Sequence, residues 1–167
     1  MNVIVESTLE MHALFKANVE RLQKSAASLA VQWIKPLLQT LILNYDGAIS
    51  KDGSGRGGGC CCDYVVNFLC GFMASGPPGL DVLGTKLEAL REGLLMMGFK
   101  SLTCFVVALE SKEAMSRLKD VVHQPRLGNR VAHALAQFGL KESTRFFWED
   151  VAPPWLVARL RHDLELG

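Results

Sequence analysis

The chain has 167 residues, of which 49% are hydrophobic and 21% are charged, and its formal net charge is +1. This composition excludes a disordered chain and suits one globular domain with an appendage, while the charge alone gives no case for a nucleic-acid or membrane partner. The apolar runs are far shorter than the ~20 residues of a membrane helix, and the N-terminus lacks the pattern of a secretory signal. We therefore expect an intracellular protein, cytoplasmic or nuclear, that is neither inserted in a membrane nor secreted.

A long helix is expected over residues 8–35. Ser7 and Glu10 form a capping box at its start, apolar residues recur at helical spacing, and Pro36 ends the run. The apolar stripe predicts either a helix packed on its own domain, which is the simpler interpretation, or a docking helix for a protein partner. The chain therefore divides into a helical extension, residues 1–36, and a domain, residues 37–167.

Three strands in a meander are expected next. Leu41 to Tyr45 is a short apolar run typical of a central strand, and residues 58–62 and 67–74 follow with a turn at 63–66. The glycine-rich residues 50–59 match neither a phosphate-binding loop nor a dinucleotide fingerprint, so they are interpreted as a hairpin connection.

The five cysteines are Cys60, Cys61, Cys62, Cys70 and Cys104. Their spacing lacks the paired Cys-x2-Cys pattern of a zinc site. We expect reduced thiols that pack as small hydrophobic side chains in strands.

Helices and strands alternate in the second half of the chain. The expected elements are a helix capped by Asp81 and closed by Gly98, a strand over 102–109, a short helix over 111–118, a strand over 120–124, a helix over 129–138 capped by Asn129, and a last helix started by Pro154. A meander followed by alternating helices and strands predicts an α/β fold with a mixed sheet, antiparallel first and parallel later, flanked by helices.

Two of the apolar strands end in an acid, Asp46 after the first and Glu110 after the fourth. The carboxyl ends of neighbouring parallel strands meet at one edge of a sheet, so the two carboxylates would share a site with a bound cation or a raised pKa. The pattern alone favours a simpler interpretation, in which each acid caps the element that follows it.

Six segments in series, from Trp33 to the C-terminus, resemble the RNase H-like domains of plant retroelements (the reverse-transcriptase-associated RNase H type-1 family). They are "WIKP", "LNYDGA", "GGGCCCDYVVNFLCGF", "EALREGLLMMGFKSLTCFVVALES", "PRLGNRVAHALAQFGL" and "WEDVAPPWLVARLRHDL". The resemblance implies an RNase H-like fold that hydrolyses RNA in RNA–DNA hybrids. It also implies four carboxylates that hold two Mg²⁺ (or Mn²⁺) ions.

The resemblance carries over to this chain only in part. Asp46 matches the first acid, and Glu110 matches the third with one extra methylene, so these two are the candidate catalytic and metal-binding residues. Lys86 stands at the position of the second acid and His133 at that of the fourth. An ammonium repels Mg²⁺ and imidazole is a poor ligand for it, so nuclease activity is expected to be weakened or lost. If Lys86 reaches Asp46, an ion pair replaces a metal ion.

Other departures concern the scaffold. Cys62 and Val66 stand where the family hairpin has Arg and Gly, so the turn is expected to be compromised. The segment between Glu110 and His123 is much shorter than in the family, and a parallel crossover needs roughly a dozen residues, so the last strand is barely reachable.

The resemblance leaves several functions open. The domain would retain nucleic-acid binding, with an RNA–DNA hybrid as the partner, through Lys86 and the residues His123, Arg126, Asn129 and Arg130. Alternatives are a working hybrid nuclease that uses Asp46 and Glu110, a non-catalytic interaction module that uses residues 8–35, and a gene product under no functional demand.

Overall fold

The structure is a computed structural model. It describes residues 13, 16–17, 19–24, 35–36, 38–103, 105–119, 121–142 and 144–165. The predicted capping box at Ser7 and Glu10, most of the predicted 8–35 helix, and Cys104 lie outside the described residues.

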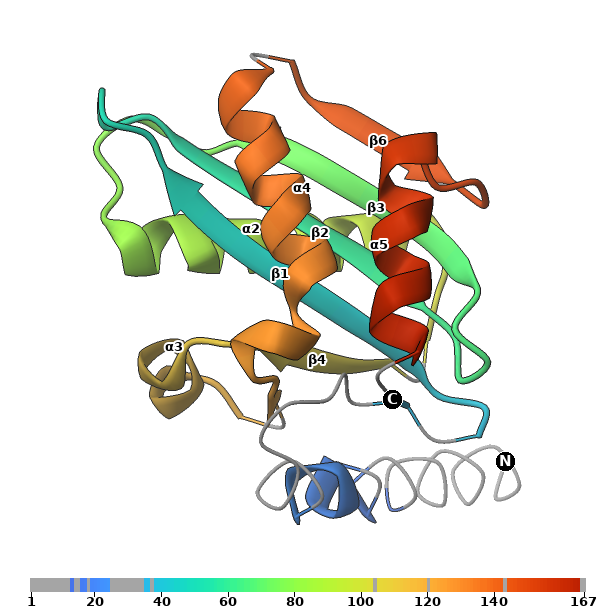
Figure 1. The fold of residues 1–167 in the computed structure, drawn as a ribbon. Coiled ribbons are helices and arrows are strands. Elements are labelled where there is room, and N and C mark those ends of the chain that lie inside the picture. The colour runs from blue at the N-terminus through green and yellow to red at the C-terminus, as the bar shows by residue number, and fades with distance from the viewer. Residues whose placement is uncertain are drawn as a thin grey trace.

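Six strands form one mixed sheet in the order β5-β4-β1-β2-β3-β6 (Figure 1). The strands are β1 (Leu41–Ile49), β2 (Gly55–Cys62), β3 (Phe68–Ser75), β4 (Phe105–Leu109), β5 (Val121–His123) and β6 (Phe146–Glu149). The helices are α2 (Val82–Phe99), α3 (Lys112–Arg117), α4 (Arg130–Lys141) and α5 (Pro154–Glu165), with a 3₁₀ turn, η1 (Arg126–Gly128), before α4. Strands β1, β2 and β3 are antiparallel, whereas β4 is parallel to β1 and β5 is parallel to β4. The predicted α/β fold is therefore confirmed.

The helices cover the two faces of the sheet, with α4 and α5 on one face and α2 on the other (Figure 1). Successive side chains of a strand point to opposite faces, so Leu43 and Tyr45 pack under α2 while Ile42 packs under α4 and α5. By the same alternation, Asp46 lies on the α4 face.

Glycines in β2 let both helices approach the sheet closely. A Cβ atom on Gly57 would lie 2.7 Å from the Cβ of Ala89 in α2, and one on Gly58 would lie 2.6 Å from the carbonyl carbon of Leu135 in α4. Both distances are below normal contact, so these two positions require the absence of a side chain. The prediction that residues 50–59 only connect strands was wrong in part, because β2 begins at Gly55.

The sixth strand was not predicted. Residues 146–149 pair with β3 in antiparallel orientation and close that edge of the sheet. This segment is four residues long and mostly exposed, so it lacks the alternation of buried and exposed side chains by which strands are recognised. Two smaller corrections concern helices: α2 continues past Gly98 to Phe99, and α4 runs to Lys141.

The short crossover to β5 is made by one small helix. Helix α3 has six residues, and the hydroxyl of Ser111 accepts a hydrogen bond from the amide of Ala114 at 3.2 Å. It leads into β5, which has three residues and is parallel to β4. The expectation that this strand is barely reachable fits its short length, but the strand does form.

The described part of the N-terminal helix packs on its own domain. Residues 19–24 are helical, and the buried side chains of Val19 and Leu22 contact Val106 and Val122 of the sheet. The side-chain amide of Gln23 donates a hydrogen bond to the carbonyl of Val121 at 2.8 Å. These contacts favour the simpler of the two interpretations of this helix. Among the described residues, no helix combines the length and apolar character that crossing a bilayer requires.

The turn between β2 and β3 forms with a valine in a left-handed conformation. Val66 has φ of 71°, a value that glycine adopts freely and that a β-branched residue rarely adopts. The carboxylate of Asp63 holds the turn by accepting hydrogen bonds from the amides of Val65 and Asn67, at 3.0 and 2.8 Å. The turn is therefore strained at Val66, as the replacement of Gly predicts, but it is not broken.

Replacing Val66 with Gly is expected to raise the free energy of unfolding by about 0.5–1 kcal/mol, because it removes the left-handed strain at a small loss of packing. Urea denaturation followed by circular dichroism measures this change. Val65→Gly is the matched control: Val65 is exposed and has no positive φ, so this change should destabilise the domain slightly. A Val66→Gly variant less stable than Val65→Gly would contradict the prediction.

Candidate functional site

The candidate site centres on Asp46, which lies in β1 opposite Gly58. Its side chain is only 4% exposed, and a buried carboxylate is costly unless other groups satisfy its oxygens. Three groups do so. The ammonium of Lys86 lies 2.9 Å from Oδ1, the backbone amide of Gly47 donates to Oδ1 at 2.9 Å, and Nδ1 of His133 lies 2.8 Å from Oδ2.

Helix α2 brings Lys86 to the site. The carboxylate of Asp81 caps the start of this helix by accepting a hydrogen bond from the amide of Gly84 at 2.6 Å, as predicted. The helix then crosses β1 so closely that a Cβ atom on Gly47 would lie 2.8 Å from the backbone nitrogen of Lys86. The lysine side chain therefore begins beside β1 and needs only to extend past Gly47 to meet Asp46.

Helix α4 brings His133 to the same carboxylate from the other face of the sheet. The missing side chain at Gly58 allows the close approach, and the side-chain amide of Asn129 donates a hydrogen bond to the carbonyl of Tyr45 at 3.1 Å. This contact fixes the start of α4 beside β1, one residue from Asp46. The imidazole of His133 remains 34% exposed, so the site opens to solvent on this side.

The structure thus brings together Asp46, Lys86 and His133, and β4, which Glu110 follows, runs parallel beside β1 with Ala108 opposite Asn44. Glu110 directly follows β4 and is half-buried. Within the described part of the chain, no group of three or more His, Cys, Asp or Glu side chains is placed to hold a metal ion.

The residues present do not fit a Mg²⁺ ion. This ion needs several oxygen ligands in near-octahedral geometry. Asp46 already gives one oxygen to an ammonium and a backbone amide and the other to an imidazole. A cation bound there would have to displace Lys86 or lie against its positive charge.

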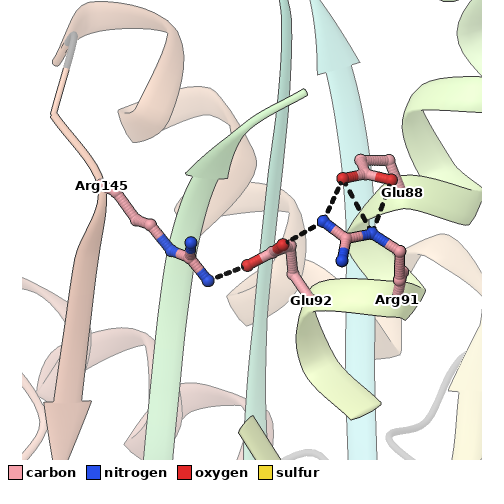
Figure 2. Close-up of polar contacts among 4 residues, drawn as sticks. All are labelled: Glu88, Arg91, Glu92 and Arg145. Atoms are coloured by element: carbon pink, nitrogen blue, oxygen red, sulfur yellow. Dashed lines mark hydrogen bonds and ion pairs between the residues drawn. The ribbon is translucent and has the colours of Figure 1, made fainter. Parts of the chain in front are cut away.

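Two further acids of α2, Glu88 and Glu92, form ion pairs with arginines and not with Lys86 (Figure 2). Nε of Arg91 lies 3.0 Å from both oxygens of Glu88, and this hydrogen bonding lowers the pKa of the Glu88 carboxyl. Glu92 is only 5% exposed, and it is bound by Arg91 at 2.6 Å and by Arg145. Arg145 directly precedes β6, so the pairing of this unpredicted strand with β3 places the second cation beside this buried carboxylate.

The residues predicted to bind nucleic acid differ in their access to solvent. Arg126 is exposed in η1, and His123 and Arg130 are half-buried beside it in the chain. Asn129 is the N-cap residue of α4, as predicted, but its side chain makes no capping hydrogen bond. Asn129 is only 1% exposed, which argues against direct contact with a nucleic acid. Its contact with Tyr45 spans 84 positions, and no local signal in the sequence points to it.

Comparison with known proteins gives structural neighbours only. No model of a protein family matches the chain, and no curated protein matches it. The solved structure of RNase H1 from the halophilic archaeon Halobacterium salinarum NRC-1 matches with a TM-score of 0.53 and 15% identity, over 62% of this chain and 98% of that one. The N-terminal RNase H domain of rv2228c from Mycobacterium tuberculosis, solved as a fusion with maltose-binding protein, matches with a TM-score of 0.50 and 14% identity, over 63% of this chain and 99% of that one.

The chain has an RNase H-like fold. Identity this low establishes the fold and nothing finer. Within this fold, Asp46 lies in β1, and a lysine from α2 and a histidine from α4 contact its carboxylate.

Proposed function

We propose that this chain is a nucleic-acid-binding RNase H-like domain of the plant retroelement type, in which hydrolysis of RNA in RNA–DNA hybrids is weakened or lost. The observation that carries the proposal is the ion pair between Lys86 Nζ and Asp46 Oδ1 at 2.9 Å. It puts a fixed positive charge against the carboxylate that the resemblance identifies as the first metal ligand.

The loss of activity follows from charge and ligand type. Metal-assisted phosphodiester cleavage depends on ions that neutralise charge on the attacking and leaving oxygens. Here Lys86 neutralises Asp46, and His133 contributes a nitrogen ligand that suits Mg²⁺ and Mn²⁺ poorly. The domain therefore lacks the concentration of negative charge that would draw either ion in.

Binding to nucleic acid needs none of these ligands. Phosphate contacts come from positive side chains, and the chain offers Arg126 in η1 and Arg130 at the start of α4. Lys86 retains 16% exposure, so it would face a phosphate at the same place where a metal ion would otherwise stand. The favoured substrate class is an RNA–DNA hybrid, on the ground of the resemblance.

The test is one assay with two readouts. A labelled RNA–DNA hybrid is incubated with the protein, with Mg²⁺, Mn²⁺ or EDTA, and both binding and cleavage are measured. We expect binding that weakens as salt rises, and no cleavage with either metal above the EDTA control. The double variant Arg126→Ala, Arg130→Ala should bind more weakly and reduce the salt slope by about 1–2.

The outcomes separate the two halves of the proposal. Cleavage that disappears in Asp46→Asn would show that the nuclease is intact. Binding that is insensitive to salt, or no stronger than that of Lys86→Glu, would contradict the proposed nucleic-acid binding and would not bear on the fold.

A further inference from the structure

Four free cysteines lie buried in neighbouring strands, Cys60, Cys61 and Cys62 in β2 and Cys70 in β3. Cys61 lies directly opposite Cys70 in the antiparallel pair. Residues opposite each other point to the same face, and both side chains belong to the cluster under α2. Cys60 and Cys62 belong to the cluster on the other face, so the sheet separates them from the facing pair.

The facing pair has the geometry that a disulfide needs. Opposite residues in antiparallel strands have Cα atoms about 4.5–5.5 Å apart, and disulfides occur at separations of about 4.4–6.8 Å. The register shifts only after this pair, between Cys61 and Cys62, where Cys62 lies opposite Phe68. Oxidation would therefore join two side chains that already face each other on one face of the sheet.

The surroundings shift the pKa values of the two thiols in opposite directions. The thiol of Cys61 donates to the sulfur of Cys70, and this contact, together with the Lys100 ammonium, lowers the pKa of Cys70 against the opposing effect of burial. The same contact and burial raise the pKa of Cys61. The lower pKa favours Cys70 over Cys61 as the sulfur that attacks the oxidant.

We propose that Cys61 and Cys70 form a redox-active dithiol, which peroxide converts into a cross-strand disulfide that links β2 to β3. In the first step the Cys70 thiolate attacks one oxygen of hydrogen peroxide, the O–O bond breaks, and Cys70 becomes a sulfenic acid while hydroxide leaves and takes a proton. In the second step Cys61 attacks the Cys70 sulfur, the S–O bond breaks, and the thiol proton of Cys61 leaves with the hydroxide as water. Two thiols lose two electrons in total, and one peroxide is reduced to two waters.

Edge strand β6 sets the access of the oxidant. Glu149 of β6 lies opposite Cys70, and β6 is the last strand at this edge of the sheet. The strand has four residues, and ion pairs between Lys100 and Glu149 at 3.0 Å and between Lys100 and Asp150 at 3.7 Å hold its end. A short edge strand opens locally more easily than a central one, which gives a molecule as small as peroxide a route to Cys70.

The test uses the folded full chain. The protein is treated with hydrogen peroxide, quenched with acid, unfolded, and alkylated with N-ethylmaleimide before mass spectrometry. We expect the loss of two hydrogen atoms and alkylation of three of the five cysteines. Proteolysis before Asp63, which lies between the two cysteines in the chain, should yield two peptides that remain joined until a reductant is added.

Variants identify the sulfurs. The double variant Cys60→Ala, Cys62→Ala should keep the link, whereas Cys61→Ala should lose it and let dimedone, a reagent for sulfenic acid, label Cys70. Circular dichroism of each variant before oxidation shows that it is folded. A link that survives in Cys61→Ala, a link between Cys60 and Cys62, or peroxide-treated folded protein with all five thiols free would overturn the proposal.

Discussion

The double variant Lys86→Glu, His133→Asp is expected to bind Mg²⁺ or Mn²⁺ at least about tenfold more tightly than the unaltered chain, a difference of about 1.4 kcal/mol. The variant is also expected to gain metal-dependent cleavage of RNA in a hybrid. The change replaces one ammonium and one imidazole with two carboxylates around Asp46. Charges a few ångströms apart interact by several kcal/mol even at the effective dielectric constant of a protein surface, so tenfold is a low estimate.

The fold already places these two positions around Asp46. Lys86 and His133 both lie within hydrogen-bond distance of Asp46, from helices on opposite faces of the sheet. Shorter acidic side chains at these two positions would leave a space between the carboxylates, and oxygen ligands are what Mg²⁺ requires. The backbone needs no change, because Gly47 and Gly58 set the approach of α2 and α4.

Calorimetric titration of metal and the hybrid-cleavage assay measure the two expected gains. The matched control is Lys86→Gln, His133→Asn, which has the same shapes without the negative charges and should gain neither property. If the acidic variant is folded but binds metal no better than this control, the ion pair is not what prevents metal binding. Metal binding without cleavage would point to Glu110, the acid that directly follows β4 and that this variant leaves unchanged.

Replacing Lys86 with Met is expected to lower the free energy of unfolding by about 2–3 kcal/mol, because it leaves the Asp46 carboxylate buried without its cation. The value falls below that of a fully buried pair for two reasons. Lys86 is 16% exposed, and Asp46 keeps its contacts with Gly47 and His133. The double variant Asp46→Asn, Lys86→Met should be less destabilised than the sum of the two single changes. In this variant Asp46→Asn removes the negative charge that Lys86→Met alone leaves without its cation.

Urea denaturation of the four proteins in this cycle gives the coupling energy, which we expect to be about 1–3 kcal/mol. Lys100→Met is the comparison outside the site. It breaks the ion pair with Glu149, whose side chain is 47% exposed, and exposed pairs contribute at most about 1 kcal/mol. Equal losses in Lys86→Met and Lys100→Met, or additive effects within the cycle, would show that the pair at Asp46 does not hold the fold together.

Local patterns in the sequence were sufficient for most of the scaffold. Apolar runs of strand length, helical spacing in α2 and α4, and the cap at Asp81 each depend on neighbours in the chain, so the element order and the mixed sheet could be predicted. The position of Asp46 at the end of an apolar run also marked it as a costly charge that requires partners. Strand β6 was not predicted, because its pairing with β3 depends on residues more than 70 positions away and its own side chains are mostly exposed.

By itself, the sequence determined that Asp46 and Glu110 each follow an apolar run, and the resemblance predicted a lysine and a histidine at the other two positions of the expected metal site. It did not determine that the lysine and the histidine both meet Asp46. Only the tertiary structure decided this, since Lys86 and His133 lie 40 and 87 positions from Asp46 and reach it from helices on opposite faces of the sheet. The physical reason is steric: the absent side chains of Gly47 and Gly58 let both helices come near enough for an ammonium and an imidazole to share one buried carboxylate.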